Sequence, residues 1–94
     1  MNDTPLQVGQ LVRSRAGRDQ GRYFMVSALV DSEYVYLVDG QLRKMEKPKK
    51  KKRKHLESRK VYFSSLRQKL EGGQTVFDYE VRQALQAAQQ NEEA

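Results

Sequence analysis

The sequence predicts a mainly β fold, in which a small, strongly bent β-barrel is followed by one or two short C-terminal α-helices. Short runs of alternating or β-branched residues follow one another from residue 9 to residue 46, with hairpin turn signals between them. In residues 64–89 the apolar residues instead recur at the spacing of a helix. The 94 residues fit one domain, and a hydrophobic content of 37% supplies a modest core. The alternative is an open α+β sheet with two helices on one face.

The first two strands are predicted on either side of a turn that contains two glycines. Leu11–Ala16 alternates between apolar and basic positions, although Leu11 falls on the basic side. Arg22–Val30 is the second strand, with Phe24, Val26 and Ala28 on one face and Tyr23, Met25 and Ser27 on the other. Between the two strands lie Gly17 and Gly21 with polar residues enclosed, and glycine adopts the positive φ angles of tight turns without a steric penalty.

Three further strands complete the predicted barrel. Tyr34–Val38 is rich in aromatic and branched residues, which favour strands. Asp39-Gly40 predicts a type I′ hairpin turn, so Leu42–Met45 is expected to be the fourth strand. Residues His55–Glu57 and Val61–Phe63 are expected to supply a fifth, short strand.

Two helices are predicted after the barrel. Ser64–Glu71 is expected to carry serine caps and to stop at Gly72-Gly73. Phe77–Gln89 is the second helix, capped by Thr75 or Asp78, and residues 90–94 are expected to fray. Its apolar residues recur at helical spacing: Phe77, Val81, Leu85 and Ala88. The chain thus divides into an N-terminal arm (1–7), a barrel (8–63) with a basic loop at 47–54, and a helical extension (64–94).

Lys47–Lys54 is the most charged stretch, with seven basic residues and one proline in eight positions. Residues 41–60 carry a net charge of +9, so the remaining residues together carry −3. Burying such a run would cost too much hydration energy, and Pro48 and self-repulsion predict an extended, mobile surface loop. A run of this kind indicates a polyanionic partner such as nucleic acid. A solvated loop and a nuclear localisation signal are the alternatives.

Several stretches resemble one family. Gly9–Val26 looks like a KOW motif, in which Gly21 is the key glycine of the turn. Ala16–Asp19, Val38–Gly40 and Arg43–Leu56 then follow one another as in the archaeal and eukaryotic large-subunit ribosomal proteins of the fourteen-e type and in their short bacterial relatives. The resemblance covers about residues 7–60. It implies an SH3-like barrel that binds structured RNA, above all ribosomal RNA of the large subunit.

The candidate RNA contacts combine the basic run, with its flanks, and the arginines of the first hairpin. Guanidinium groups suit phosphate contacts and base stacking, and lysines supply point charges. Arg18 could instead pair locally with Asp19. Stacking on bases is a further possibility for Tyr23, Tyr34 or Tyr36, whichever face outward. The candidate contacts are Arg13, Arg15, Arg18, Arg22, Arg43, Lys44, Lys47, Lys49, Lys50, Lys51, Lys52, Arg53, Lys54 and His55.

Other functional classes find little support in the residues. The sequence has no cysteine and one histidine, His55, and it contains no nucleophile–base set or nucleotide-binding glycine loop. We therefore expect neither catalysis nor a metal or cofactor. The absence of a signal peptide and of a long apolar run predicts a cytoplasmic protein that contacts no membrane. The alternative function is a protein–protein docking module of the translation or transcription machinery, with the helix at Phe77–Gln89 as a contact surface.

Overall fold

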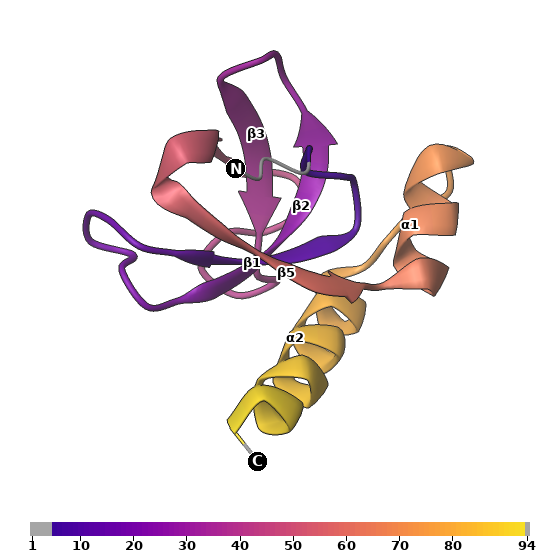
Figure 1. Ribbon diagram of the computed structural model, residues 1–94. Helices are drawn as coiled ribbons and strands as arrows, with labels where there is room; N and C mark the ends of the chain where they lie inside the picture. Colours follow the sequence, from indigo (N-terminus) through magenta and orange to yellow (C-terminus); the bar gives the residue numbers. More distant parts are fainter. Residues whose placement is uncertain (1–4, 94) are drawn as a thin grey trace.

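The structure is a computed structural model that describes residues 5–93. One antiparallel sheet has the strand order β4-β3-β2-β1-β5, and two helices follow it (Figure 1). The strands are β1 (Gln10–Ser14), β2 (Tyr23–Leu29), β3 (Tyr34–Val38), β4 (Lys49–Lys52) and β5 (Leu56–Tyr62). A 3-10 turn, Arg53–His55, joins β4 to β5, and the helices are α1 (Ser64–Glu71) and α2 (Asp78–Glu93). The expected mainly β class with two C-terminal helices is confirmed.

Two apolar clusters lie on opposite faces of the sheet, which explains the imperfect alternation of the first strand. Val12 faces Phe24 across the β1–β2 pair, and both belong to the inner cluster with residues of β3, the start of β5 and Leu6. Leu11 faces Met25, and both belong to an outer cluster that includes residues of α1 and α2. Because β1 is covered on both faces, its consecutive residues are buried.

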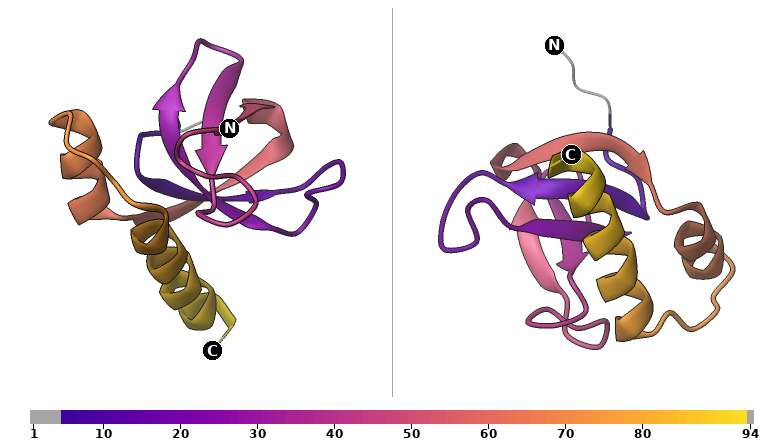
Figure 2. Two further views of the ribbon diagram at one scale, coloured as in Figure 1. Left: turned by 180° about the vertical axis from the view of Figure 1, so that it is seen from behind. Right: turned by 90° about the horizontal axis from the view of Figure 1, so that it is seen from below.

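Helix α2 lies along the outer face of the sheet, whereas α1 lies to one side (Figure 2). Val81, Leu85 and Ala88 are buried as expected. Gly40 allows the close approach of α2, since a Cβ atom there would lie 2.4 Å from the carbonyl oxygen of Asp78. Phe77 is 54% exposed, so its expected place in the buried stripe is wrong.

The second helix differs from the prediction at both ends. It continues to Glu93, so the expected fraying from residue 90 is wrong up to that residue, and Ala94 lies outside the described residues. At its start, Glu80 accepts a hydrogen bond from the backbone N–H of Phe77 at 3.1 Å. Asp78 instead accepts one from the N–H of Met45 at 2.8 Å, which ties the helix to the β3–β4 loop.

Helix α1 has the predicted bounds, but its N-terminus is not capped as predicted. Phe63 is its N-cap residue and makes no side-chain capping bond, so the expected serine caps are wrong. The stop at Gly72-Gly73 is confirmed, because Gly72 is the C-cap and Gly73 has a φ of 74°.

The first hairpin forms close to where it was expected. Gly17 and Gly21 have φ angles of 79° and 88°, and Gly21 donates a hydrogen bond to the carbonyl of Ser14 at 2.7 Å. The described part of the arm begins at Pro5, and Leu6 is buried in the inner cluster. The arm's first four residues lie outside the described residues.

The fourth strand is the main correction. Residues 42–45 lie in a loop, and β4 is instead the lysine run Lys49–Lys52, which pairs with β3. The expected type I′ turn is also wrong, because Asp39 has no positive φ. Its Oδ1 accepts hydrogen bonds from the backbone N–H groups of Gln41 and Arg43, which opens a wider loop. The basic run is therefore a sheet edge followed by a 3-10 turn and not a mobile loop.

The fifth strand is one continuous element and not two short pieces. Leu56–Tyr62 pairs with β1, and the register shifts between Gln10 and Val12. No helix between residues 5 and 93 has the length and apolar character needed to cross a membrane.

Candidate nucleic-acid interface

The pairing of β4 with β3 sorts its four lysines onto two faces of the sheet. Lys49 and Lys51 are opposite Leu37 and Val35, whose side chains belong to the inner cluster. Lys50 and Lys52 are opposite Tyr36 and Tyr34. Directly paired residues of an antiparallel sheet lie on the same face, so Lys49 and Lys51 are the inner pair and Lys50 and Lys52 the outer pair.

The outer pair surrounds an aromatic ring. The Nζ atoms of Lys50 and Lys52 lie 4.8 and 6.0 Å from the ring centroid of Tyr34, within the range of a cation–π interaction. Lys50 is exposed, and Lys52 and Tyr34 are half-buried. Neither lysine makes an ion pair with any residue that the structure describes. The outer pair therefore presents two positive charges without a salt bridge, although the charge of Lys50 helps to lower the pKa of nearby Asp31.

The inner pair is held by the first hairpin. The Nζ of Lys49 lies 2.5 Å from Oδ2 of Asp19, and the Nζ of Lys51 donates to the carbonyl of Ala16 at 3.3 Å. Asp19 is only 8% exposed, and its hydrogen bond to Lys49 lowers the pKa of its carboxyl, aided by the charges of Lys49, Arg43 and Lys51. Asp19 therefore pairs with Lys49 of β4, and not with its neighbour Arg18 as the sequence alternative suggested.

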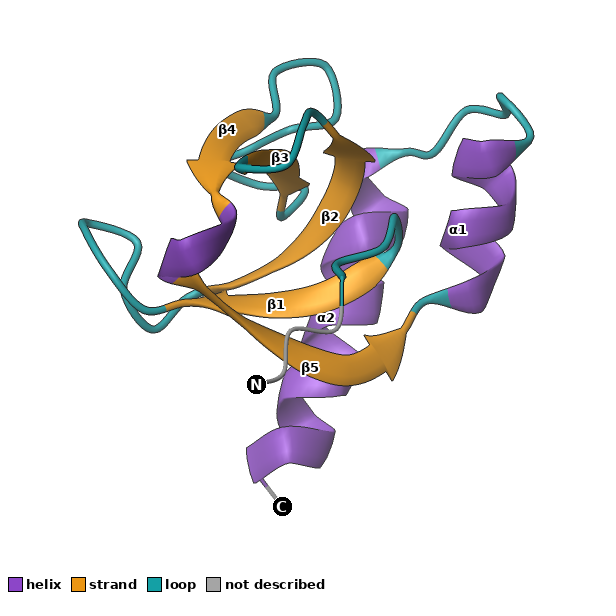
Figure 3. Cartoon of the chain, turned by 45° about the horizontal axis from the view of Figure 1, so that its top comes forward, coloured by secondary structure: helices purple, strands orange, loops and turns teal. Residues whose placement is uncertain are grey.

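The hairpin also contacts the turn that follows β4. Arg15 donates from Nε and Nη2 to the carbonyl of Lys54 at 3.1 and 2.9 Å, and its backbone N–H donates to the carbonyl of His55 at 2.9 Å. Figure 3 shows this turn leading from β4 into β5. Residues 15–19 of the hairpin and residues 49–55 therefore form one continuous region, called here the basic surface.

His55 lies within this surface. Desolvation and the neighbouring charges of Lys54, Lys51, Lys52 and Arg15 lower the pKa of its imidazole. Its usual pKa is 6.5, so the ring is predominantly neutral at pH 7. It is a polar neighbour of the cations and adds no charge of its own.

A turn between β2 and β3 borders the outer pair. Oδ1 of Asp31 accepts hydrogen bonds from the N–H groups of Glu33 and Tyr34, each at 2.8 Å, and these bonds lower the pKa of its carboxyl. The carbonyl of Glu33 accepts from the N–H of Arg53 at 2.8 Å. The turn therefore fixes both Tyr34 and the start of the 3-10 turn.

A small hollow of about 250 Å³ lies between that turn and residues 52–54. The Nε atom of Arg53 is buried and has no acceptor among the described residues. A buried donor without an acceptor costs free energy, and this one is closed off from solvent. Lys52 and Lys54 line the same hollow.

Of the other candidate residues, Arg43 is close enough to Asp19 to help lower its pKa, whereas Arg13 and Arg22 pair with other carboxylates. Arg13 is on the outer face, 3.7 Å from Glu57 and with its guanidinium 6.0 Å from the ring centroid of Tyr23. Arg22 lies 3.8 Å from Oδ2 of Asp39, the carboxylate that holds the loop of Arg43. Arg18 is exposed at the tip of the first hairpin, and Lys44 and Lys47 are exposed in the β3–β4 loop.

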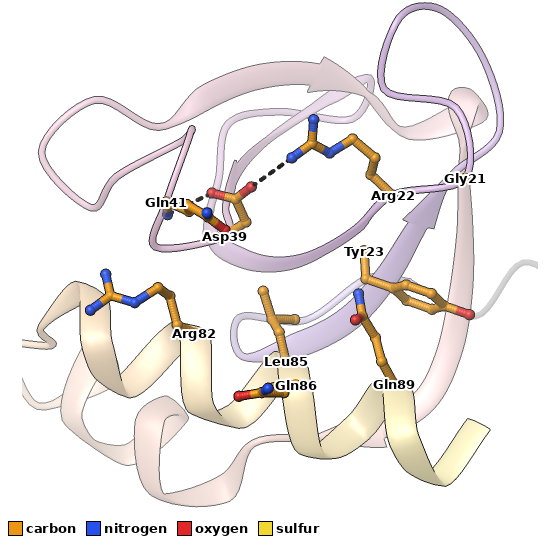
Figure 4. A pocket seen from close by; sticks show the side chains of 9 residues that line it. All are labelled: Gly21, Arg22, Tyr23, Asp39, Gln41, Arg82, Leu85, Gln86 and Gln89. Carbon is orange, nitrogen blue, oxygen red and sulfur yellow. Dashed lines mark hydrogen bonds and ion pairs between the residues drawn. The ribbon is translucent and has the colours of Figure 1, made fainter. Parts of the chain in front are cut away.

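A larger cavity of about 480 Å³ opens beside Arg22, between the sheet and α2 (Figure 4). Tyr23, Gln86 and Gln89 are among the residues that line it. Sequence reasoning did not single out the glutamines, because their shared position follows from the packing of α2 on the sheet. A pair of glutamines three residues apart on a helix was the only available signal.

The part of the chain that the structure describes contains no group of three metal-ligating side chains. Lysine and arginine side chains on an exposed surface are the groups with which proteins contact phosphates. Compared with known proteins, the sequence matches no family model and no curated protein.

Proposed function

We propose that this protein binds structured RNA through the basic surface, and that its sheet is an SH3-like barrel of the KOW type. The proposed partner is ribosomal RNA of the large subunit, which places the protein in the cytoplasm. The family and the ribosomal target rest on the resemblance of residues 7–60. The binding mode rests on side-chain geometry.

The outer pair is the observation that carries the proposal. Lys50 and Lys52 lie on one face of an edge strand, where Tyr34 restrains them and neither forms a salt bridge with a described residue. The charge of Lys50 also helps to lower the pKa of Asp31 in the neighbouring turn. Two restrained, unpaired cations lose less side-chain entropy on binding than two mobile ones.

Recognition on this surface is mainly of phosphates and of RNA shape. Lysines bind phosphates as point charges and release counterions, so affinity falls as salt rises. The contacts of Arg15 with the turn after β4 make the hairpin and the strand one rigid surface, so a folded RNA meets charges at fixed spacing. Phosphate contacts of this kind position the RNA without reading its sequence.

Fluorescence anisotropy with labelled fragments of structured ribosomal RNA tests the proposal directly. We expect saturable binding that weakens steeply between about 50 and 200 mM salt, as counterion release requires. Sedimentation of cell extract at low and high salt tests the ribosomal target, since the chain is expected in ribosomal fractions only at low salt. Absence of RNA binding at low salt would refute the RNA-binding function.

A docking module is the second candidate, and one observation favours it. Phe77 and Tyr79 stack at the start of α2, with centroids 6.0 Å apart, and are 54% and 52% exposed. Aromatic residues exposed together are enriched in protein interfaces. Co-purification after nuclease treatment separates the candidates, because a protein partner bound here is retained when RNA is removed and is lost from a Phe77→Ser, Tyr79→Ser variant.

A further inference from the structure

The cavity between α2 and the first hairpin has the size and position of a binding site. Its volume of about 480 Å³ falls within the range of roughly 300 to 1,000 Å³ that is usual for small-ligand sites. Arg22 and Gln41 line it on the sheet side, and Arg82 and Gln86 line it from α2. The inference that follows rests on the proposed RNA-binding function.

One part of the wall is aromatic and apolar. Tyr23 lies at the start of β2, and Leu85 of α2 packs against the sheet behind the cavity (Figure 4). The guanidinium of Arg13 lies 6.0 Å from the ring centroid of Tyr23. Because this guanidinium lies over one face of the ring, a flat heterocycle in the cavity would stack on the other face.

Three amide side chains supply the polar part of the wall. Gln41 comes from the β3–β4 loop, and Gln86 and Gln89 come from successive turns of α2. Their side-chain amides make no hydrogen bond among the described residues, although each has two donors and an acceptor. Such paired donors and acceptors match the edges of nucleobases, which present both kinds of group.

The charged residues that line the cavity are two arginines, Arg22 and Arg82, and one carboxylate, Asp39. Arg22 interacts with Asp39 at 3.8 Å and is 44% exposed, so it remains accessible to a second anion. Arg82 donates from Nη1 to the carbonyl of Gly40 at 2.7 Å, which fixes its guanidinium at the opposite side of the opening. Two arginines at the mouth suit the phosphates that flank a single nucleotide.

From these contacts we infer that the cavity receives one unstacked nucleobase of the bound RNA. The base stacks on Tyr23 and its edge faces the glutamine amides, while the flanking phosphates lie against Arg22 and Arg82. The basic surface then binds the RNA by charge, and the cavity selects RNA that offers an unpaired base. In a fully paired duplex a base can enter the cavity only after it is unpaired and unstacked, which costs free energy.

Two RNAs with the same number of phosphates test this inference by anisotropy: a stem with an unpaired loop and a fully paired duplex. The wild-type chain is expected to bind the stem-loop about tenfold more tightly, since stacking of one base on an aromatic side chain is worth about 1–3 kcal/mol. Gln86→Leu with Gln89→Leu is expected to remove this preference and to leave duplex affinity unchanged. Gln83→Leu is the matched control, because Gln83 is an exposed glutamine of α2 that does not line the cavity.

Equal affinity of the wild-type chain for both RNAs, or a preference that survives the double substitution, would overturn the inference while leaving the proposed function intact. If neither RNA binds, the proposed function fails, and the cavity is tested on its own by NMR. Adenosine, guanosine, cytidine and uridine monophosphates are titrated against ribose 5-phosphate. Shifts at Tyr23, Gln86 and Gln89 with at least one nucleotide, but not with ribose 5-phosphate, support a base site. Equal shifts with both, or none with any nucleotide, refute it.

Discussion

The inner and outer lysine pairs of β4 have the same residue type in the same four-residue strand, yet their surroundings are opposite. Lys49 and Lys51 reach the first hairpin, where one meets a buried carboxylate and the other a carbonyl oxygen. Lys50 and Lys52 lie close to the ring of Tyr34 and form no salt bridge with the described residues. Strand geometry has thus divided a uniform charge run into a structural half and a half available for binding.

This division changes how the charge run is interpreted. Lysines on an edge strand also discourage pairing with other chains, and that role needs no RNA. It would not require a cation–π contact or a salt bridge to the hairpin, however. The two explanations differ in what the outer pair does when an anion is offered, and the following substitutions separate them.

The largest effect is expected from Lys50→Ala with Lys52→Ala. RNA affinity at low salt should fall by about tenfold to a hundredfold, because two phosphate contacts are lost. The free energy of unfolding should change little, since neither lysine has an ion-pair partner in the described chain. Anisotropy and urea denaturation measure the two quantities. Lys60→Ala, an exposed lysine of β5 at the other end of the strand order, is the control, and an equal loss there would contradict a localised site.

Lys49→Met tests the structural half and should lower stability by about 1–3 kcal/mol, because Asp19 is left buried without its partner. The pKa of Asp19 is below its ordinary 3.8 in the folded chain, so the pair stabilises the fold above that pH. Its contribution is lost as the pH falls through the folded pKa. Urea denaturation at pH 7 should therefore separate the variant from the wild type, and the difference should shrink near pH 2. Lys50→Met, the control, should differ little from the wild type at either pH.

Tyr34→Leu is expected to weaken RNA binding by about two- to fivefold, because a cation–π contact at an exposed site is worth about 0.5–1 kcal/mol. The substitution keeps an apolar residue in β3 and removes only the ring that restrains the outer pair. Tyr34→Phe keeps the ring and should bind as the wild type does in the same anisotropy assay. A Phe variant as weak as the Leu variant would assign the effect to the hydroxyl group.

The smallest effect is expected at His55. Burial and nearby cations lower its pKa in the free protein, and bound phosphate neutralises those cations, so RNA should raise the pKa toward 6.5. By linkage, RNA affinity should increase as the pH falls through 6.5. The folded chain alone should lose stability over the same range, because a depressed histidine pKa favours protonation of the unfolded state. NMR titration of the imidazole with and without RNA measures the shift, and a pKa that falls on binding would contradict the placement of RNA near His55.

Local sequence signals predicted the elements whose own residues favour them. Tyr34–Val38 and Ser64–Glu71 have the predicted bounds, because branched and aromatic residues favour the first and helical spacing with a glycine stop defines the second. The glycines of the first hairpin likewise marked its turn. The charge of the basic run was also accessible from sequence, whereas its contacts with the first hairpin appear only in the structure.

The features that were missed depend on contacts between distant residues. Four lysines have low β propensity, and β4 forms because it completes the edge of β3 while Asp19 neutralises Lys49. The carboxylate of Asp39 accepts hydrogen bonds from the N–H groups of Gln41 and Arg43, and a wider loop forms where the sequence favours a tight turn. Neither the two faces of β4 nor the glutamine-lined cavity could be derived without the register of the sheet and the packing of α2.

The salt dependence of RNA binding for two double variants tests the central claim most directly. The slope of log affinity against log salt should become shallower by roughly 1.4 to 1.8 for Lys50→Ala with Lys52→Ala, at about 0.7 to 0.9 for each lost phosphate contact. Lys49→Ala with Lys51→Ala, measured where it remains folded, should keep the wild-type slope. Equal reductions in both variants would contradict the account, because the four lysines would then act as one undivided charge.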